Sequence, residues 1–325
     1  MPDPRTIMPD SRRSPRFAGV CTFCRYPLLE LVPPASRPID WALYGVPYDT
    51  GVTYRPGARF APRAIREASQ YVKRYHMEHA VDVCDVLSLC DAGDAPVLPY
   101  HPEQCLREVA TWATSLADPG TKLLAIGGDH SIAYANIRAT WERRGRPAGG
   151  LALVHFDSHL DTVDSVWGEK WSHASPFIRA IEDGLVDPRA MISIGIKGPL
   201  NTPKDLDFAR DRGIEIVTYD RWSREGHAPI DAFLRKLAGR DAYLTFDVDC
   251  IDPAFAPGTG TPCPGGFTSA EVLALLRALR GVNLVGADVV EVLPDRDPAG
   301  VTSFLAAHVA FEILALDAAK RASTR

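Results

Sequence analysis

Residues 151–162 read LALVHFDSHLDT, an apolar run that ends in acidic and histidine residues. Its apolar first half is typical of a strand that is buried on both faces of a sheet. Asp157, His159 and Asp161 follow at every second position, so their side chains share one face of an extended chain. Carboxylates that converge at a buried strand end repel one another and lose hydration, and a divalent cation removes both costs. The alternative is a solvated loop that is acidic by chance.

Two further strand ends argue against that alternative. Asp247 and Asp249 follow the apolar run at 242–246, and His130 lies in the turn after the run at 122–126. Parallel strands end at one edge of an open α/β sheet, where such sheets place their sites. The candidate ligands at these strand ends are too many for one ordinary transition-metal site. They suit two ions about 3.5–4 Å apart that share bridging carboxylates. The candidate metal ligands are His130, Asp157, His159, Asp161, Asp247 and Asp249.

Strand and helix patterns alternate along the whole chain. Strands are predicted at 39–46, near 85–90, and at 122–126, 150–156, 190–196, 214–218, 241–247 and 284–291. Helices are predicted at 62–69, 103–117, 131–144, 175–184, 203–212, 229–238, 268–279 and 301–319. This order predicts an α/β fold, a three-layer αβα sandwich around a parallel sheet of roughly eight strands.

The 325 residues are predicted to form one domain over 17–325, preceded by a flexible tail over 1–16. The tail has no apolar segment and does not resemble a signal peptide. A net charge of −5 with no basic patch argues against nucleic acid. No apolar run approaches the ~20 residues that span a bilayer, so no membrane partner is expected.

The seven cysteines are odd in number and scattered, which is not a disulfide framework. A reducing cytoplasm is therefore the expected location. Cys21 and Cys24 form a lone CxxC pair, for which free thiols are favoured over a redox or zinc role.

Three motifs carry a resemblance to a known family: GGDHS at 127–131, FDSHLD at 156–161 and FDVDCIDPAFAPGTGTP at 246–262. Together with shorter matches at 45–51, 54–59 and 289–294, they resemble the ureohydrolase (arginase/agmatinase) family from about Phe17 onward. The resemblance implies the arginase-like αβα fold. It also implies hydrolysis of a guanidino C–N bond to urea, or a substituted urea, and an amine.

The resemblance also implies a distribution of ligands over two metals. One metal takes His130, Asp157, Asp161 and Asp247; the other takes His159, Asp157, Asp247 and Asp249, so that Asp157 and Asp247 bridge. Oxygen-rich ligation suits a cation such as manganese better than thiolate-bound zinc. Family precedent implies Mn²⁺ as the usual metal and Ni²⁺ in some guanidine-type members. His155 and Asp129 are expected to support the site by hydrogen bonds rather than to ligate.

A metal-bridging hydroxide is expected to attack the guanidinium carbon. His173 occupies the position of the family's proton-shuttling histidine, and its alternative is a solvated loop histidine. Glu291 matches the carboxylate that pairs with the guanidinium, and its alternative is a structural glutamate. Asp161 is counted with these two as catalytic as well as a ligand.

The substrate is expected to be a small guanidino compound. The stretch 161–173 lacks the Asn/Thr/Ser-rich pattern with which arginases bind an α-amino acid, so the chain is agmatinase-like. That subgroup also includes guanidinobutyrase, guanidinopropionase and hydrolases of guanidine or biguanides. Cys263 in TPCPGG replaces a usual glutamate and HAS at 173–175 replaces a usual HGT, which argues against agmatine itself.

Cys263 together with Trp167 and Trp171 favours a compact or N-alkylated guanidine such as guanidine or metformin, if the tryptophans lie at the entrance. If a guanidino acid were preferred instead, Lys170 would be the first basic residue to test. Rival hypotheses are a mononuclear zinc amidohydrolase of the histone-deacetylase type and a silent subunit of a hetero-oligomer with a paralogue. The family precedent implies a homo-oligomer, either a trimer or a hexamer.

Overall fold

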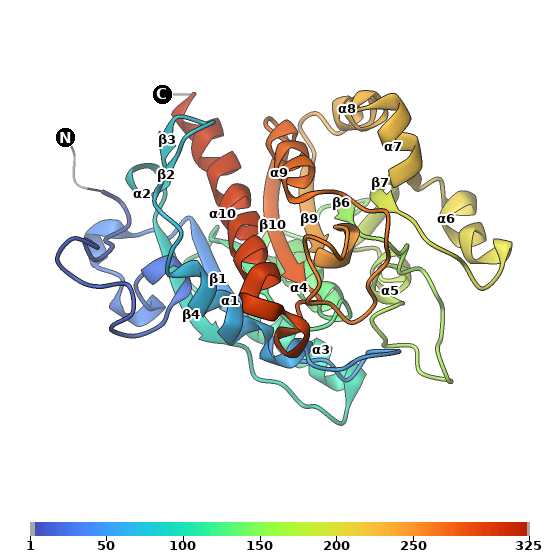
Figure 1. The fold of residues 1–325 in the computed structure, drawn as a ribbon, viewed down its shortest axis with the longest axis horizontal. Coiled ribbons are helices and arrows are strands. Elements are labelled where there is room, and N and C mark those ends of the chain that lie inside the picture. Colours follow the sequence, from blue (N-terminus) through green and yellow to red (C-terminus); the bar gives the residue numbers. More distant parts are fainter. Residues whose placement is uncertain (1–3, 324–325) are drawn as a thin grey trace.

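An eight-stranded parallel sheet forms the centre of the computed structural model, which describes residues 4–323 (Figure 1). The strand order is β4-β1-β5-β10-β9-β6-β7-β8. The prediction of a roughly eight-stranded parallel sheet is confirmed. The strands are β1 (Trp41–Gly45), β4 (Leu89–Asp94), β5 (Lys122–Ile126), β6 (Leu151–Phe156), β7 (Val186–Ile196), β8 (Glu215–Thr218), β9 (Asp241–Asp247) and β10 (Asn283–Val290).

Helices cover both faces of the sheet and enclose two apolar cores, one on each face. One face carries α1 (Ala61–Ser69), α2 (Val83–Val86), α7 (Tyr219–Glu225), α8 (Ala228–Lys236), α9 (Ser269–Ala278) and α10 (Val301–Ala322). The other carries α3 (Pro102–Thr114), α4 (Ile132–Arg143), α5 (Pro176–Glu182) and α6 (Asp207–Arg212). This is the three-layer αβα arrangement that the alternating pattern predicts.

The sheet order brings the predicted site together. β5, β10, β9 and β6 are consecutive neighbours in the centre of the sheet, although they are far apart in sequence. Their pairing is in register near the carboxyl ends, where Phe156 lies opposite Phe246 and Val290 lies opposite Asp247. The loops that follow these four strands therefore leave the sheet side by side, as an open parallel sheet requires.

Helix α10 runs along one face of the sheet between α1 and α9 (Figure 1). It is long and apolar enough to cross a bilayer by length and composition, with a mean hydropathy of 1.7 in its most apolar window. The sequence expectation of no such segment was wrong on this measure, because Glu312 and Asp317 interrupt the apolar run without lowering its average much. Since 72% of that window is buried within the protein, α10 is a core helix.

Several local predictions differ from the structure. Residues 85–86 belong to α2 rather than to a strand, and a two-stranded hairpin, β2 (Tyr75–His76) with β3 (Val81–Asp82), precedes them. The predicted helix at 203–212 begins as a 3₁₀ turn with a capping box at Thr202. Helix α7 was missed, because its mixed sequence shows no clear apolar period. The predicted helix at 268–279 is α9, and a capping box at Thr268 opens it.

The expected flexible tail over 1–16 is anchored at Thr6, and its residues 1–3 lie outside the described chain. Thr6 is buried, its N–H donates to Cys84 O at 2.9 Å, and its Oγ1 accepts from Leu89 N–H at 2.9 Å. These bonds attach the segment to α2 and to the start of β4, so Thr6 is not part of a free tail. All seven cysteines are free thiols in the described structure.

Candidate metal and active site

Three carboxylates surround the Nδ1 atom of His130, which lies in the turn between β5 and α4. Nδ1 is 2.9 Å from Asp161 Oδ2, 3.0 Å from Asp157 Oδ2 and 3.3 Å from Asp247 Oδ2. It makes no hydrogen bond to any residue in the described chain. Three strand ends thus place one imidazole nitrogen and three carboxylate oxygens around a common point.

The other ring nitrogen of His130 indicates where its proton lies. Thr245 Oγ1 donates to Asp288 Oδ1 at 2.6 Å, so the same hydroxyl accepts from His130 Nε2 at 2.8 Å. With the proton on Nε2, Nδ1 presents a lone pair to the carboxylates. A lone pair and three carboxylates repel one another, and a cation at their common point satisfies all four.

A second cluster shares Asp157 with the first. His159 Nδ1 lies 3.3 Å from Asp157 Oδ1 and 3.1 Å from Asp249 Oδ2. The two oxygens of Asp157 therefore face different histidines, Oδ2 toward His130 and Oδ1 toward His159. This is the arrangement expected of a carboxylate that bridges two ions. Asp247 directs Oδ2 at His130, while its Oδ1 accepts the Asp249 N–H at 2.8 Å.

The protonation of the site shows a need for positive charge. Burial, together with the charges of Asp249 and Asp157, raises the pKa of Asp247 well above its usual range. Burial and the charge of Asp157 also raise the pKa of Asp161. Burial alone would lower the pKa of His130, but the surrounding carboxylates raise it well above its usual value. The donor set therefore fits divalent cations, which supply the charge that protons would otherwise provide.

Glu291 follows β10 with a backbone φ of 63°, in the left-handed region that non-glycine residues rarely adopt. Its Oε1 accepts the His130 N–H at 2.8 Å and lies 2.9 Å from His173 Nδ1. Its Oε2 is buried without a partner in the described chain. Such an oxygen costs about 1–3 kcal/mol when unpaired, so Oε2 marks a place where a ligand can donate. Asp161 also has a positive φ, of 51°.

His173 is buried between Glu291 and Thr53. The Thr53 N–H donates to His173 Nε2 at 3.0 Å, and Thr53 Oγ1 lies 2.7 Å from the same nitrogen. Thr53 thus offers a donor to the neutral ring and an acceptor to the protonated ring. Burial alone would lower the pKa of His173, but the charge and hydrogen bond of Glu291 raise it to about 9. The Thr53 N–H opposes this rise in the pKa of His173, because it donates to a lone pair on Nε2 and so favours the neutral ring.

The backbone of Gly51 holds the His173 loop close. The His173 N–H donates to Gly51 O at 2.9 Å, and a Cβ at Gly51 would lie 3.0 Å from His173 N. A glycine is needed for this approach.

Asp129, expected to support the turn, accepts from Gly51 N–H at 2.8 Å and Ser131 N–H at 2.9 Å. Burial and the charge of Glu291 raise the pKa of Asp129 to about 7.

The hydrogen-bonding role predicted for His155 is confirmed. Its Nδ1 lies 3.0 Å from Ser193 Oγ, and its Nε2 lies 2.9 Å from Asp157 Oδ2. Supporting residues that sequence reasoning missed are Thr53, Ser158, Thr245 and Asp288. Thr245 could have been found, because it lies two positions before Asp247 and so shares its face of the strand.

A cavity of about 380 Å³ opens beside His159 and is lined by residues 54–55, 197–199 and 261–263. Cys263 lines it, as the loop position suggested. Trp167 and Trp171 do not, so the expected aromatic entrance is wrong. Trp167 is 85% exposed, and Trp171 packs against Tyr134 with ring centroids 4.9 Å apart. Trp171 lines a separate cavity of about 580 Å³ that includes no candidate metal ligand.

Comparison with known proteins identifies the family. Residues 39–316 match the model of the arginase family. The chain is 42% identical to guanidinopropionase of Pseudomonas aeruginosa, over 94% of each chain. It is 40% identical to proclavaminate amidinohydrolase of Streptomyces clavuligerus, over 94% of this chain and 95% of that protein. The chain belongs to the arginase family.

Solved structures agree with this assignment. The structure of proclavaminate amidinohydrolase from Streptomyces clavuligerus matches with a TM-score of 0.86, over 94% of this chain and 100% of that one. A hypothetical agmatinase from Burkholderia thailandensis matches with a TM-score of 0.83 and 36% identity, over 94% and 93% of the two chains. This arginase-family chain is therefore a metal-dependent hydrolase that acts on the C–N bond of a guanidino or amidine group.

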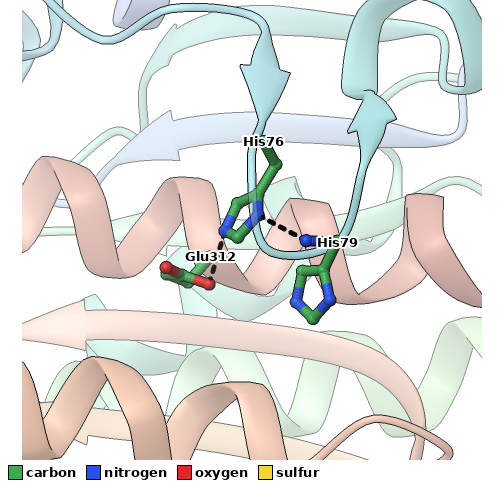
Figure 2. Close-up of side chains that lie close together, drawn as sticks. All are labelled: His76, His79 and Glu312. Atoms are coloured by element: carbon green, nitrogen blue, oxygen red, sulfur yellow. Dashed lines mark hydrogen bonds and ion pairs between the residues drawn. The ribbon is translucent and has the colours of Figure 1, made fainter.

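A second group of metal-ligating residue types lies apart from this site. His76 from β2, His79 from the hairpin loop and Glu312 from α10 lie close together (Figure 2). His76 Nδ1 accepts the His79 N–H at 3.1 Å, and His76 Nε2 lies 2.9 Å from Glu312 Oε2. The other carboxylate oxygen accepts from Arg277 at 2.7 Å. These bonds already occupy the His76 lone pair and both Glu312 oxygens, so the group fastens the hairpin to α10 and α9.

Glu312→Gln is expected to lower the free energy of unfolding by about 1–3 kcal/mol, because it leaves buried His76 and the Arg277 guanidinium poorly paired. Chemical denaturation at constant slope measures the change. Glu78→Gln is the matched control, since Glu78 is exposed and lies 3.6 Å from the same histidine. Equal losses from both changes would show that Glu312 has no special structural role.

Proposed function

We propose that this chain hydrolyses a small guanidino compound to urea, or a substituted urea, and an amine at a binuclear centre of divalent cations. The observation that carries the proposal is the unpartnered Oε2 of Glu291, buried beside two clusters that share Asp157. A guanidinium presents a planar fork of N–H donors that a carboxylate accepts in pairs. Named relatives include agmatinase, guanidinopropionase and guanidinobutyrase, and these names support a substrate of this chemical group.

The two clusters support an assignment of ligands to each cation. His130, Asp157, Asp161 and Asp247 would hold one ion, and His159, Asp157, Asp247 and Asp249 the other. Asp157 has the geometry of a bridge, while bridging by Asp247 stays a prediction. The oxygen-rich donor set favours Mn²⁺, with Ni²⁺ as the alternative. When bound, a pair of such cations lowers the pKa of water so that a nucleophile is available near neutral pH.

The chain's own side chains supply orientation and proton transfer. Glu291 would fix the plane of the guanidinium with its free Oε2, because its other oxygen is held by His130 N–H and His173. His173 would deliver a proton to the departing amine nitrogen, which cannot leave as an anion. Thr53 would hold His173 in place through both protonation states.

Two rivals account for less of the site. A mononuclear zinc amidohydrolase would leave the His159, Asp157 and Asp249 cluster without a purpose. A silent subunit would be marked by a missing ligand, whereas all six candidate positions carry ligating side chains. Homo-oligomeric assembly and a cytoplasmic location stay predictions.

Metal-stripped protein reloaded with Mn²⁺ or Ni²⁺ provides the test. Elemental analysis is expected to find two ions per chain, and urea release is expected from at least one small guanidino compound. Full activity with one ion per chain would overturn the binuclear centre. An absence of urea release from every guanidino compound by the two-metal protein would overturn the reaction.

Glu291→Gln is expected to lower kcat/KM by about 10²-fold or more, because the amide cannot accept the guanidinium fork as an anion. It also removes the negative charge that raises the pKa of His173, so the alkaline limb of the pH–rate profile should move to lower pH. Metal content is expected to stay at two ions per chain. A change in metal content with an unmoved pH profile would assign Glu291 to metal support instead.

A further inference from the structure

The cavity beside His159 has an unusual charge for a pocket in an acidic protein. Arg55 and Lys197 line it, and no carboxylate does. The remaining wall includes Tyr54, Thr261 and Cys263, none of which is an acidic residue. Because His159 belongs to the metal clusters, a substrate whose guanidino group reaches these clusters can extend its other end into this cavity.

Arg55 is half-buried and has no carboxylate partner in the described chain. Its guanidinium carbon lies 4.7 Å from the centroid of the Tyr54 ring, and Nη2 donates to Tyr54 Oη at 3.3 Å. Arg59, four residues later, is by contrast paired with buried Asp49. The remaining N–H groups of Arg55 are therefore available to a ligand.

Lys197 adds a second positive charge at the same cavity. Its ammonium donates to Asp249 O at 2.7 Å and to Ser158 Oγ, which fixes it between the metal cluster and the cavity. These contacts are to neutral acceptors, so its charge is not neutralised by them. Two cations that face one small volume raise the local concentration of anions and repel an ammonium group.

Cys263 occupies a position at which a carboxylate could have balanced the charges of Arg55 and Lys197. It is 9% exposed, and a Cβ at Gly198 would overlap its Sγ, so the thiol fills the space beside Gly198. Gly260 on the same loop approaches Arg55, since a Cβ there would lie 2.9 Å from Arg55 O. The loop around Cys263 and the segment at 54–55 thus form one wall.

We infer that the substrate of this chain is a guanidino carboxylic acid, whose carboxylate binds Arg55 with Lys197 adding to the attraction. The inference rests on the proposed function, since it requires the guanidino group to lie at the metal clusters. It replaces the expectation of a compact or N-alkylated guanidine, which depended on Trp167 and Trp171 in combination with Cys263. It also moves the basic group from Lys170, which does not line the cavity, to Arg55.

A set of substrates that differ only at the distal end tests the inference with the Mn²⁺-loaded full chain. The acid is 4-guanidinobutyrate, the neutral analogue is pentylguanidine, and the cation is agmatine. We expect kcat/KM for the acid to exceed that for the neutral analogue at least tenfold, about 1.4 kcal/mol, with agmatine lowest. Hydrolysis with agmatine preferred, or with no preference for the acid, would overturn the inference and leave the proposed function standing. Hydrolysis of none of the three would overturn the inference, and it would overturn the proposed function as well if no other guanidino compound released urea.

Variants assign the preference to the cavity. Arg55→Gln is expected to lower the acid-to-neutral ratio of kcat/KM at least tenfold, and Arg55→Lys is expected to lower it less. Cys263→Glu should lower the same ratio and raise the agmatine-to-neutral ratio, because it places a carboxylate in the wall. Arg296→Gln, which removes an exposed arginine outside the cavity, is the control and should leave the ratio unchanged. Unchanged ratios in both Arg55→Gln and Cys263→Glu would overturn the inference.

Discussion

Asp157→Ala is expected to leave the protein with neither metal ion and without measurable hydrolysis. Asp157 is the residue that directs one oxygen at His130 and the other at His159, so its loss weakens both clusters together. Elemental analysis after dialysis should find less than half an ion per chain, against two in the unchanged protein. Activity should fall by about 10⁴-fold or more, because both the nucleophile and its orientation depend on the metals.

Two further variants separate a bridging role from a structural one. Asp157→Asn keeps the shape of the side chain and an acceptor for His155, so the fold should be retained while metal affinity falls. Asp211→Asn, on the exposed surface of α6, is the control for removal of one negative charge. Retention of one tightly bound ion in Asp157→Asn would contradict the bridge and assign Asp157 to a single metal.

The candidate ligands could be predicted from sequence because their positions follow from strand geometry. A buried strand that ends in alternating polar residues places them on one face, as at Asp157, His159 and Asp161. Parallel strands bring their carboxyl ends to one edge of the sheet. The GGDHS turn at 127–131 and residues 246–249 are therefore expected to lie beside Asp157, His159 and Asp161. Which strands become neighbours could not be predicted in this way, because the order β5-β10-β9-β6 joins strands that are far apart in sequence.

Contacts between loops could not be predicted in this way. Thr53 meets His173 across 120 residues of chain, and Asp288 fixes the proton of His130 through Thr245. The Thr245–Asp288 pair joins β9 and β10, whose pairing the sequence does not show. The Thr53–His173 pair joins two loops, and loops have no fixed period. The same reason explains the error at Trp167 and Trp171, whose nearness to the metal ligands in sequence suggested nearness to the substrate.

His173→Asn is expected to keep both metal ions and to lower kcat by about 10²–10⁴-fold, the usual contribution of a positioned acid or base. Asparagine retains an acceptor for the Thr53 N–H but cannot exchange a proton near neutral pH. Since Glu291 raises the pKa of His173 to about 9, the ring is protonated below that pH and can donate to the departing amine. The alkaline limb of the pH–rate profile of the unchanged protein should therefore report the pKa of His173. This limb should disappear in His173→Asn.

Added imidazole distinguishes loss of the proton donor from loss of structure. His173→Ala opens a space between Thr53 and Glu291, and exogenous imidazole is expected to restore part of the rate in a concentration-dependent way. Restoration should follow the protonated form of the added base, because the departing amine needs a proton. His101→Asn, at an exposed histidine before α3, is the control and should be neither impaired nor rescued. Unchanged kcat in both His173 variants would make His173 a loop residue and require another donor for the amine.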